Sequence, residues 1–194
     1  IELYKEFMTD IAEEIERENK IITDLLSLVK MDKTSANLNI ENRNLNELIE
    51  LILKRLRPIA KQRNIDVLYE SAREVFAEID EVKLTLAISN LVENAIKYNK
   101  EYGYVKVSLD ADHQFATIMV EDNGIGIPEE AQEHIFERFY RVDKSHSREI
   151  GGTGLGLAIA RNAILLHRGS IKIDSEEGQG TVFTVKIPII YVSK

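Results

Sequence analysis

The sequence contains no cysteine, and its basic residues are fewer than its acidic ones. Without cysteine the chain can form neither a disulfide framework nor a thiolate metal site, which fits a reducing compartment. No apolar run approaches the roughly 18 residues that would span a bilayer, so we expect no membrane segment in these residues. The 25 Lys and Arg residues against 33 Asp and Glu give a net charge of −8. This balance argues against nucleic acid as a partner, because phosphates need a basic face.

The length and composition are those of a soluble globular protein. The chain has 194 residues, enough for one well-buried core with a small appendage at about 100 to 200 residues per domain. Hydrophobic residues make up 44% and charged residues 30%, as is usual for soluble proteins. The chain begins at Ile1 with no signal-peptide pattern, so we expect a piece of a longer protein that can be attached to a membrane upstream.

Residues 1–33 predict one amphipathic helix, and residues 34–40 a linker. The helix has a single apolar stripe at steps of three and four residues, formed by Phe7, Ile11, Ile15, Ile22, Leu25, Leu26 and Val29. It is either an ordinary surface helix or one that packs on this domain, on a second copy, or on a helix missing upstream. Residues 34–40 are polar and without a pattern, so the main domain is expected at residues 41–191.

Helical periodicity recurs in the main domain. A capping box of Asn44 and Glu47 starts a helix that Pro58 should kink or end. A second helix is expected at residues 81–98, and Ala131, Ile135 and Phe139 mark the face of a third. A last helix begins after a glycine run near residue 155 and should be capped by Gly169.

Strand patterns separate these helices. Short strands are expected at residues 65–70 and 75–79. Two longer alternating runs, 104–109 and 115–120, should be antiparallel neighbours. Residues 170–175 and 181–187 should form a hairpin around residues 177–180.

The loop from Glu121 to Pro128 joins an alternating apolar run to a helix-start signal. Gly124 and Gly126 permit positive φ and let a flat ligand come close, because neither has a Cβ. Asp122 beside them only accepts hydrogen bonds, so it suits a ligand edge that donates, such as the amine of adenine. The alternative is a plain hairpin turn. That alternative explains Gly124 but neither Gly126 nor the proline and two acids that follow.

Three polar side chains lie along one side of the helix expected at residues 81–98. Asn90, Asn94 and Lys97 are spaced four and three residues apart, so their side chains point to the same side of the helix. Asparagine costs roughly 0.5 kcal/mol against alanine inside a helix, so two in register need a reason. The amide oxygen of Asn94 can bind Mg²⁺, which fills its octahedron with phosphate and water, and Lys97 can meet a phosphate. The alternative is a solvated helix face.

A basic segment and a glycine-rich segment follow. Residues 138–148 carry Arg138, Arg141, Lys144 and Arg148 against a single acid, which predicts a mobile lid with a positive lining. The run from Gly151 to Leu157 lacks the lysine of a Walker loop and the last glycine of a dinucleotide fingerprint. Its glycines suit a phosphate-bearing ligand at a helix N-terminus.

Four stretches of this chain resemble, in order, the N, G1, F and G2 boxes of sensor histidine kinases. They are Asn90 to Tyr98, Asp122 to Gly126, Phe136 to Arg141, and Gly152 to Leu157. The resemblance covers about residues 40–190, and four ordered boxes are far more specific than any one alone. It implies an α/β fold, a two-layer sandwich of the Bergerat type with a mixed sheet backed by helices, preceded by one long N-terminal helix.

The resemblance also implies roles for the site residues. Asp122 would contact adenine, Asn94 would hold Mg²⁺, and Asn90, Lys97 and Arg141 would serve the phosphate end. Phe136 and Phe139 would brace the lid. The other residues implied to bind ATP are Tyr98, Gly124, Gly126, Ile127, Tyr140, Gly152, Thr153, Gly154, Leu155, Gly156, Leu157 and Thr181. ATP and Mg²⁺ are therefore the expected cofactors.

By the same resemblance, residues 1–33 look like the second helix of the dimerisation hairpin of such kinases. The first hairpin helix would carry the phosphate-accepting histidine, which an acidic residue normally follows. The four histidines here are followed by Gln114, Ile135, Ser147 and Arg168, so we expect the catalytic half without its acceptor. The implied partners are that histidine-bearing helix, a second copy in a full-length homodimer, and the receiver domain of a response regulator. The domain would be cytoplasmic and the full-length protein attached to the membrane.

The reaction implied is in-line transfer of the γ-phosphoryl group of ATP to a histidine nitrogen. The alternatives are an ATP hydrolase of the chaperone, topoisomerase or mismatch-repair kind, a nucleotide-sensing module without catalysis, and a serine kinase related in fold. Asn90 argues against the hydrolase. Such enzymes have a glutamate at this place that takes a proton from water, and an amide cannot take that proton.

Overall fold

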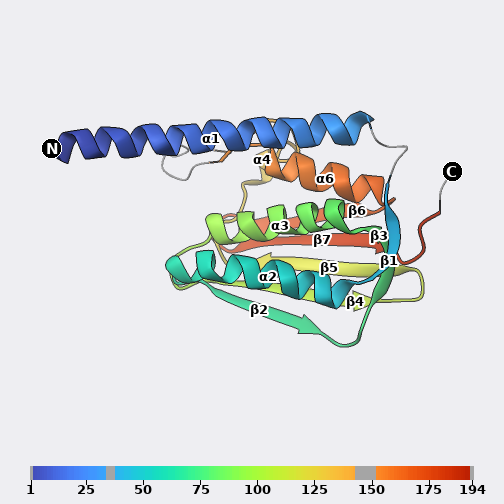
Figure 1. Cartoon of the computed structure of the whole chain (residues 1–194). Coiled ribbons are helices and arrows are strands. Elements are labelled where there is room, and N and C mark those ends of the chain that lie inside the picture. Colours follow the sequence, from blue (N-terminus) through green and yellow to red (C-terminus); the bar gives the residue numbers. More distant parts are fainter. Residues whose placement is uncertain (1, 34–37, 143–151, 193–194) are drawn as a thin grey trace.

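A five-stranded mixed sheet, covered on one face by three helices, forms the body of the computed structural model, which describes residues 2–33, 38–142 and 152–192 (Figure 1). The strand order is β2 (Asp66–Ser71), β4 (Tyr104–Ala111), β5 (Phe115–Asp122), β7 (Gly180–Pro188) and β6 (Ser170–Glu176). β2 pairs parallel with β4, and the other pairs are antiparallel. The helices are α2 (Leu45–Gln62), α3 (Glu81–Lys97) and α6 (Gly156–Leu166). The expected α/β fold, with a mixed sheet backed by helices, is confirmed.

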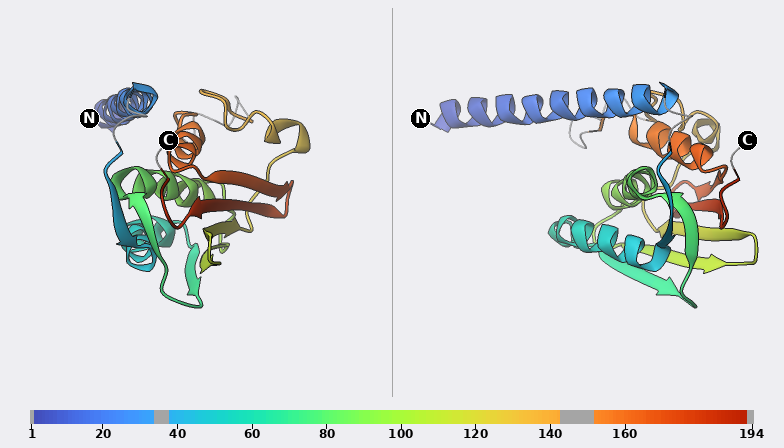
Figure 2. Two further views of the ribbon diagram at one scale, coloured as in Figure 1. Left: turned by 90° about the vertical axis from the view of Figure 1, so that its right-hand side faces the viewer. Right: turned by 45° about the vertical axis from the view of Figure 1, so that its right-hand side comes forward.

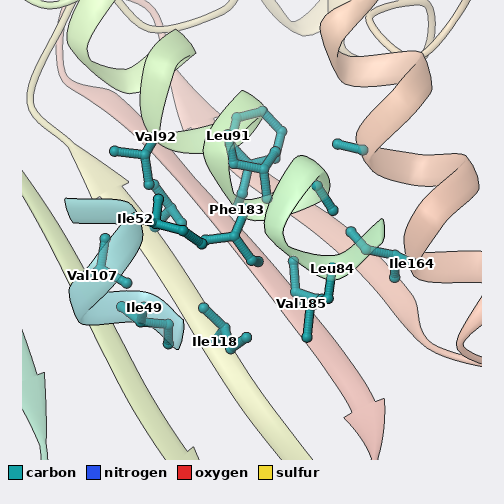
Figure 3. Packing of buried hydrophobic residues seen from close by; sticks show 14 of the residues in the cluster. Ile49, Ile52, Leu84, Leu91, Val92, Val107, Ile118, Ile164, Phe183 and Val185 are labelled. Atoms are coloured by element: carbon teal, nitrogen blue, oxygen red, sulfur yellow. The ribbon is translucent and has the colours of Figure 1, made fainter. Parts of the chain in front are cut away.

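The core lies between this sheet and its helices. Alternate residues of each central strand point to the helices, as Ala116, Ile118 and Val120 of β5 do, and all three are fully buried. Figure 3 shows Ile118 and the β7 side chains Phe183 and Val185 meeting residues of α2, α3 and α6. Because each fully buried aliphatic side chain contributes about 1.5 to 3 kcal/mol, this one-sided alternation accounts for the layering.

The N-terminus of α2 forms as the capping signal predicts, but its C-terminus does not. The Asn44 side chain accepts hydrogen bonds from the amides of Asn46 and Glu47. Pro58 does not end the helix, which continues to Gln62. Pro58 and Lys54, whose carbonyl loses its donor, are both exposed, so water can satisfy that carbonyl.

The chain also forms a second, two-stranded sheet. β1 (Ile40–Asn44) pairs antiparallel with β3 (Phe76–Asp80). β3 was expected and β1 was not, because its sequence is polar and three of its five residues are exposed. β1 exists because β3 offers it a hydrogen-bonding edge, which no local pattern in residues 40–44 announces.

The helix predicted after the loop at residues 121–128 is much shorter than expected. α4 (Glu129–Gln132) is a single turn. Ala131 and Ile135 are buried as predicted, but Phe139 is 56% exposed and has a positive φ of 65°. The Phe139 amide donates to the Gly154 carbonyl at 2.9 Å. The chain therefore leaves the helix to pair with the glycine-rich segment.

The cap of α6 is displaced by one residue from the prediction. Arg168, rather than Gly169, takes the left-handed conformation, with φ of 58°. The Gly169 amide donates to the Ile164 carbonyl at 3.0 Å. Gly169 is still required, because a Cβ there would lie 2.5 Å from the Lys186 carbonyl oxygen.

α1 (Glu2–Lys33) lies along α6, and its N-terminal half projects past the rest of the molecule (Figures 1 and 2). Leu28 and Met31 are buried and Leu25 partly so. The predicted apolar stripe is otherwise exposed, by 54% at Leu26 and 61% at Phe7. Packing on this domain thus uses a face displaced from that stripe. None of the described helices is long and apolar enough to cross a membrane.

Candidate functional site

Segments that are distant in the sequence enclose a cavity of about 470 Å³. Its walls come from α1, the second half of α3, the loop after β5, residues 140–142, the start of α6 and the start of β7. Of the predicted site residues, it is lined by Asn90, Asn94, Lys97, Tyr98, Asp122, Gly126, Ile127, Tyr140, Arg141, Gly152, Thr153, Gly154, Gly156, Leu157 and Thr181. Gly124 and Leu155 do not line it. Leu155 is fully buried in the core.

Asp122 ends β5 inside this cavity and is 9% exposed. Its Oδ1 accepts a hydrogen bond of 2.8 Å from the Gly124 amide. Burial raises the pKa of the Asp122 carboxyl to about 6, against the opposing hydrogen bonds from the backbone of Gly124 and Thr181. At neutral pH the group is therefore mostly ionised, and it presents a desolvated acceptor to a donor group of a ligand.

The two loop glycines beside Asp122 make room for protein atoms. A Cβ on Gly124 would lie 2.3 Å from the Tyr98 carbonyl oxygen. Gly126 has a φ of 69°, and a Cβ there would lie 2.0 Å from the Glu176 carbonyl oxygen. The loop is thus pressed between the end of α3 and the β6–β7 hairpin. The plain-turn alternative does not account for this packing.

The polar side of α3 faces the cavity as its spacing predicts. The Asn90 Nδ2 donates to the Leu86 carbonyl at 2.9 Å, which fixes the orientation of that amide. The side chain of Asn94 lines the cavity, and within the described residues it makes no hydrogen bond. Its amide oxygen can therefore reach a ligand or a cation. The described residues contain no cluster of three His, Cys, Asp or Glu that could hold a metal by itself. Mg²⁺ at Asn94 would take most of its ligands from phosphate and water.

Lys97 is the most strongly perturbed cation of the cavity. Burial, then the charges of Arg141, Lys20 and Arg63, lower its pKa to about 8, with Glu93 opposing. Its Nζ lies 5.2 Å from the centre of the Tyr98 ring. A Cβ on Gly152 would lie 2.3 Å from that Nζ. The glycine-rich segment therefore lies directly against Lys97.

Only part of the predicted lid is described. Arg141 lines the cavity, whereas Lys144 and Arg148 lie outside the described residues. Phe136 packs edge-on against Phe183 with ring centres 6.3 Å apart, and Arg161 covers the Phe136 ring at 5.5 Å. Phe136 is thus in contact with two side chains, whereas Phe139 is exposed.

Several lining residues escaped sequence reasoning. Ile135 and Phe183 form apolar wall, and Glu93 precedes Asn94. Lys20 and Asp24 come from α1. Local periodicity holds no signal for these two, because their partners are distant in the sequence.

Comparisons with known proteins give the family and the fold of this chain. The family model described as histidine kinase-, DNA gyrase B-, and HSP90-like ATPase matches residues 79–190. Sensor histidine kinase RppB of Synechocystis sp. is 41% identical over 177 residues, which cover 91% of this chain and 39% of RppB. Sensor histidine kinase WalK of Bacillus subtilis is 38% identical over 185 residues, covering 94% and 30%. The chain thus spans between 30% and 39% of the length of these relatives.

The solved structure of histidine kinase ThkA is also similar. Its catalytic domain aligns with a TM-score of 0.70 and 32% identity, covering 79% of this chain and 97% of that one. ThkA in complex with response regulator protein TrrA aligns with a TM-score of 0.75 and 28% identity, covering 96% and 51%.

Proposed function

This chain belongs to the family of histidine kinase-, DNA gyrase B- and HSP90-like ATPases, as an ATP-binding catalytic domain of the histidine kinase type, and on that basis we propose that it transfers the γ-phosphoryl group of ATP to a histidine on the hairpin of the same kinase. The observation that carries the proposal is the convergence in one cavity of a buried acceptor, Asp122, with Asn94 and the cation Lys97. Asp122 suits the adenine amine of ATP, Asn94 suits a metal ion bound to its phosphates, and Lys97 suits the negative charge of those phosphates.

The proposed roles follow the position of each side chain. Asp122 accepts a hydrogen bond from the adenine amine. Asn94 offers an oxygen to Mg²⁺, which when bound neutralises the charge that builds up on the phosphates. Lys97 and Arg141, which also line the cavity, stabilise the transferring group. Tyr98, Tyr140, Thr181 and the glycine-rich segment enclose the nucleotide.

Asn90 supports a kinase over a hydrolase. Its amide nitrogen is held by the Leu86 carbonyl, and an amide cannot remove a proton from water. A kinase benefits when water near the γ-phosphate is left without a base, because hydrolysis would waste the phosphoryl group. The proposed acceptor is the imidazole of the incoming hairpin.

The partners proposed are those of a two-component system. We assign α1 to the second helix of the hairpin, with its exposed stripe turned to the first helix and to a second copy in a homodimer. A response regulator receives the phosphoryl group, by analogy with ThkA, which has been solved with TrrA. We place the domain in the cytoplasm and the full-length kinase at the membrane.

A transfer assay tests the proposal. The chain, mixed with γ-labelled ATP, Mg²⁺ and a polypeptide carrying the hairpin of the same kinase, should label the hairpin with an acid-labile, base-stable phosphate. Alone it should bind ATP and remain unlabelled. Acid-stable label would show the wrong acceptor chemistry. Hydrolysis near the enzyme median of about 10 per second would favour the hydrolase.

The metal role has its own test. ATP affinity should rise when Mg²⁺ is added to the unmodified chain, and Asn94→Ala should abolish that rise while the circular dichroism spectrum is unchanged. An Asn94→Ala variant that keeps the full Mg²⁺ effect would remove Asn94 from the proposed coordination sphere.

A further inference from the structure

Helix α1 places two charged side chains in the cavity wall that the roles above leave unexplained. Lys20 and Asp24 are four residues apart, so they lie on the same side of the helix. Both line the cavity. A helix that served only as the second helix of a dimerisation hairpin would have no need of charged groups there.

Asp24 ties α1 to the glycine-rich segment. The Thr153 hydroxyl donates to Asp24 Oδ2 at 2.8 Å. The same hydroxyl oxygen accepts from the Leu155 amide at 3.2 Å, immediately before α6 begins. Leu28, one turn further along α1, is fully buried. These contacts fix where α1 crosses the cavity, and so they fix the position of Lys20.

Lys20 lies beside the residues proposed to meet phosphate. Its Nζ is 3.4 Å from Glu93 Oε2, and the two side chains are 59% and 41% exposed. An exposed pair of this kind is weak, so Lys20 can exchange Glu93 for a stronger anion. The charge of Lys20 is also among those that act on Lys97, together with Arg141. Lys20, Lys97 and Arg141 all line the cavity, and the first and third are close enough for their charges to act on Lys97.

We propose that α1 is a working part of the nucleotide site, with Asp24 anchoring it on the glycine-rich segment and Lys20 supplying a third cation to the polyphosphate of the nucleotide. The inference rests on the proposed function and deepens it. Lys20 binds a phosphate oxygen, whereas Asp24 is a positioning residue that acts through Thr153. A displacement of α1 along or away from α6 then changes the affinity for phosphate without touching the adenine end.

The test compares ATP with adenosine, measured by titration calorimetry or fluorescence on the whole chain at low salt. Lys20→Gln should weaken ATP binding about fivefold, the size expected of a partly exposed ion pair, and leave adenosine binding unchanged. Lys20→Arg, which keeps the charge, should retain most of the ATP affinity. Lys5→Gln, at an exposed lysine about four turns earlier on α1, is the matched control and should change neither affinity.

The anchoring part is tested by combining variants. Thr153→Val removes the hydroxyl that donates to Asp24 on α1. Thr153→Ser keeps a hydroxyl and should retain the ATP affinity of the unmodified chain. If Thr153 and Asp24 act through Lys20, Thr153→Val should weaken ATP binding clearly in the unmodified chain and much less in Lys20→Gln. Fully additive losses would overturn the anchoring role.

The outcomes separate this inference from the proposed function. Lys20→Gln with unchanged ATP affinity, or with equal losses for ATP and adenosine, overturns the inference alone. Equal losses in Lys20→Gln and Lys20→Arg assign the effect to packing and overturn it as well. Failure of the unmodified chain to bind ATP would instead reject the proposed function.

Discussion

Asp122 and Lys97 show how one cavity moves two pKa values towards neutrality from opposite sides. Burial raises the pKa of Asp122 to about 6 and lowers the pKa of Lys97 to about 8. In both cases burial disfavours the charged form. A ligand that brings a donor to the acid and an anion to the amine relieves both costs. Residues with such displaced pKa values cluster at functional sites.

Asp122→Asn tests the acid. The asparagine oxygen still accepts a hydrogen bond, but it carries no charge. If the side chain flipped, its amide NH2 group would face the adenine amine, and two donors would oppose each other. ATP affinity should fall by about 1.5 to 3 kcal/mol, the range for a hydrogen bond to a charged group. The unmodified chain should also prefer ATP to GTP, because guanine presents a carbonyl where adenine presents the amine. Equal affinities for the two nucleotides would contradict this role, and competition titration measures both.

The lowered pKa of Lys97 predicts how ATP binding depends on pH. The free site loses the Lys97 charge as pH rises through about 8, so ATP affinity should fall as pH rises through that value. Lys97→Met should weaken ATP binding at neutral pH and remove this alkaline fall. Lys100→Met, at an exposed lysine three residues later, is the control and should keep the pH profile. An unaltered profile in Lys97→Met would exclude Lys97 as the titrating group.

Among the elements, α3 serves the core and the site at once. Leu84, Ile88 and Leu91 are fully buried against the sheet, while Asn90, Asn94 and Lys97 line the cavity. The period of 3.6 residues separates these two faces. Its N-terminus is held by the Asp80 side chain, which accepts from the Lys83 amide at 3.1 Å.

A buried histidine joins this end of α3 to α6. The His167 Nε2 accepts from the Asp80 amide at 3.0 Å, and its Nδ1 faces the Ala163 carbonyl at 2.7 Å. The neutral ring with a proton on Nδ1 satisfies both contacts. His167 is 1% exposed, and burial lowers its pKa below 6.5, although the nearby carbonyl and carboxylate oppose this.

His167 should therefore destabilise the protein in mild acid. With the folded pKa below the unfolded one, the unfolded chain binds more protons as pH falls below 6.5, so stability is complete above that value and is lost towards the folded pKa. Asp122 contributes a slope of opposite sign in this window, because its folded pKa is raised to about 6. Urea denaturation from about pH 7.5 to about pH 5 therefore compares the unmodified chain with His167→Gln, which has a donor and an acceptor but no such titration. The stability of the unmodified chain should fall relative to that of the variant as the pH falls. A slope unchanged in His167→Gln would place its origin elsewhere.

At the scale of the whole molecule, α1 is one helix that projects at its N-terminal half and lines the site with its C-terminal half (Figure 1). Its C-terminal half packs on α6 (Figure 1). The first residues of α6 line the cavity. The exposed residues of its stripe, such as Phe7 and Ile15, leave a surface on the projecting half for another helix. The contact of Asp24 with Thr153 joins this helix directly to the wall of the cavity.

Leu28→Ala should loosen α1 without unfolding the sheet. Leu28 is fully buried, and such a truncation costs about 2 to 5 kcal/mol. Hydrogen exchange should show loss of protection along α1 while β5 and β7 keep theirs. Leu26→Ala, at a residue that is 54% exposed, should stay within about 0.5 kcal/mol of the unmodified chain. Equal loss of protection in α1 and in the central strands would show that α1 is not a separate unit.

Sequence patterns alone determined most of the elements and one wall of the site. Alternation and helical periodicity predicted β2 to β7, α2, α3 and α6. Helices cover one face of the sheet, so buried hydrophobic residues recur every second residue in the strands and every three to four residues in the helices. The spacing of Asn90, Asn94 and Lys97 and the loop at Asp122 predicted which side chains share a cavity. Such signals are local, so a single chain segment carries them.

The tertiary structure decided whatever depends on a partner distant in the sequence. The polar strand β1 forms because β3 is beside it. α4 stops early because Phe139 pairs with Gly154. Lys20 and Asp24 enter the cavity because α1 docks on α6 through Leu28 and Met31, which lie off the stripe that periodicity selected. In each case a long-range contact outweighs a local preference, since burial and hydrogen bonding exceed the few tenths of a kcal/mol that intrinsic propensity contributes per residue.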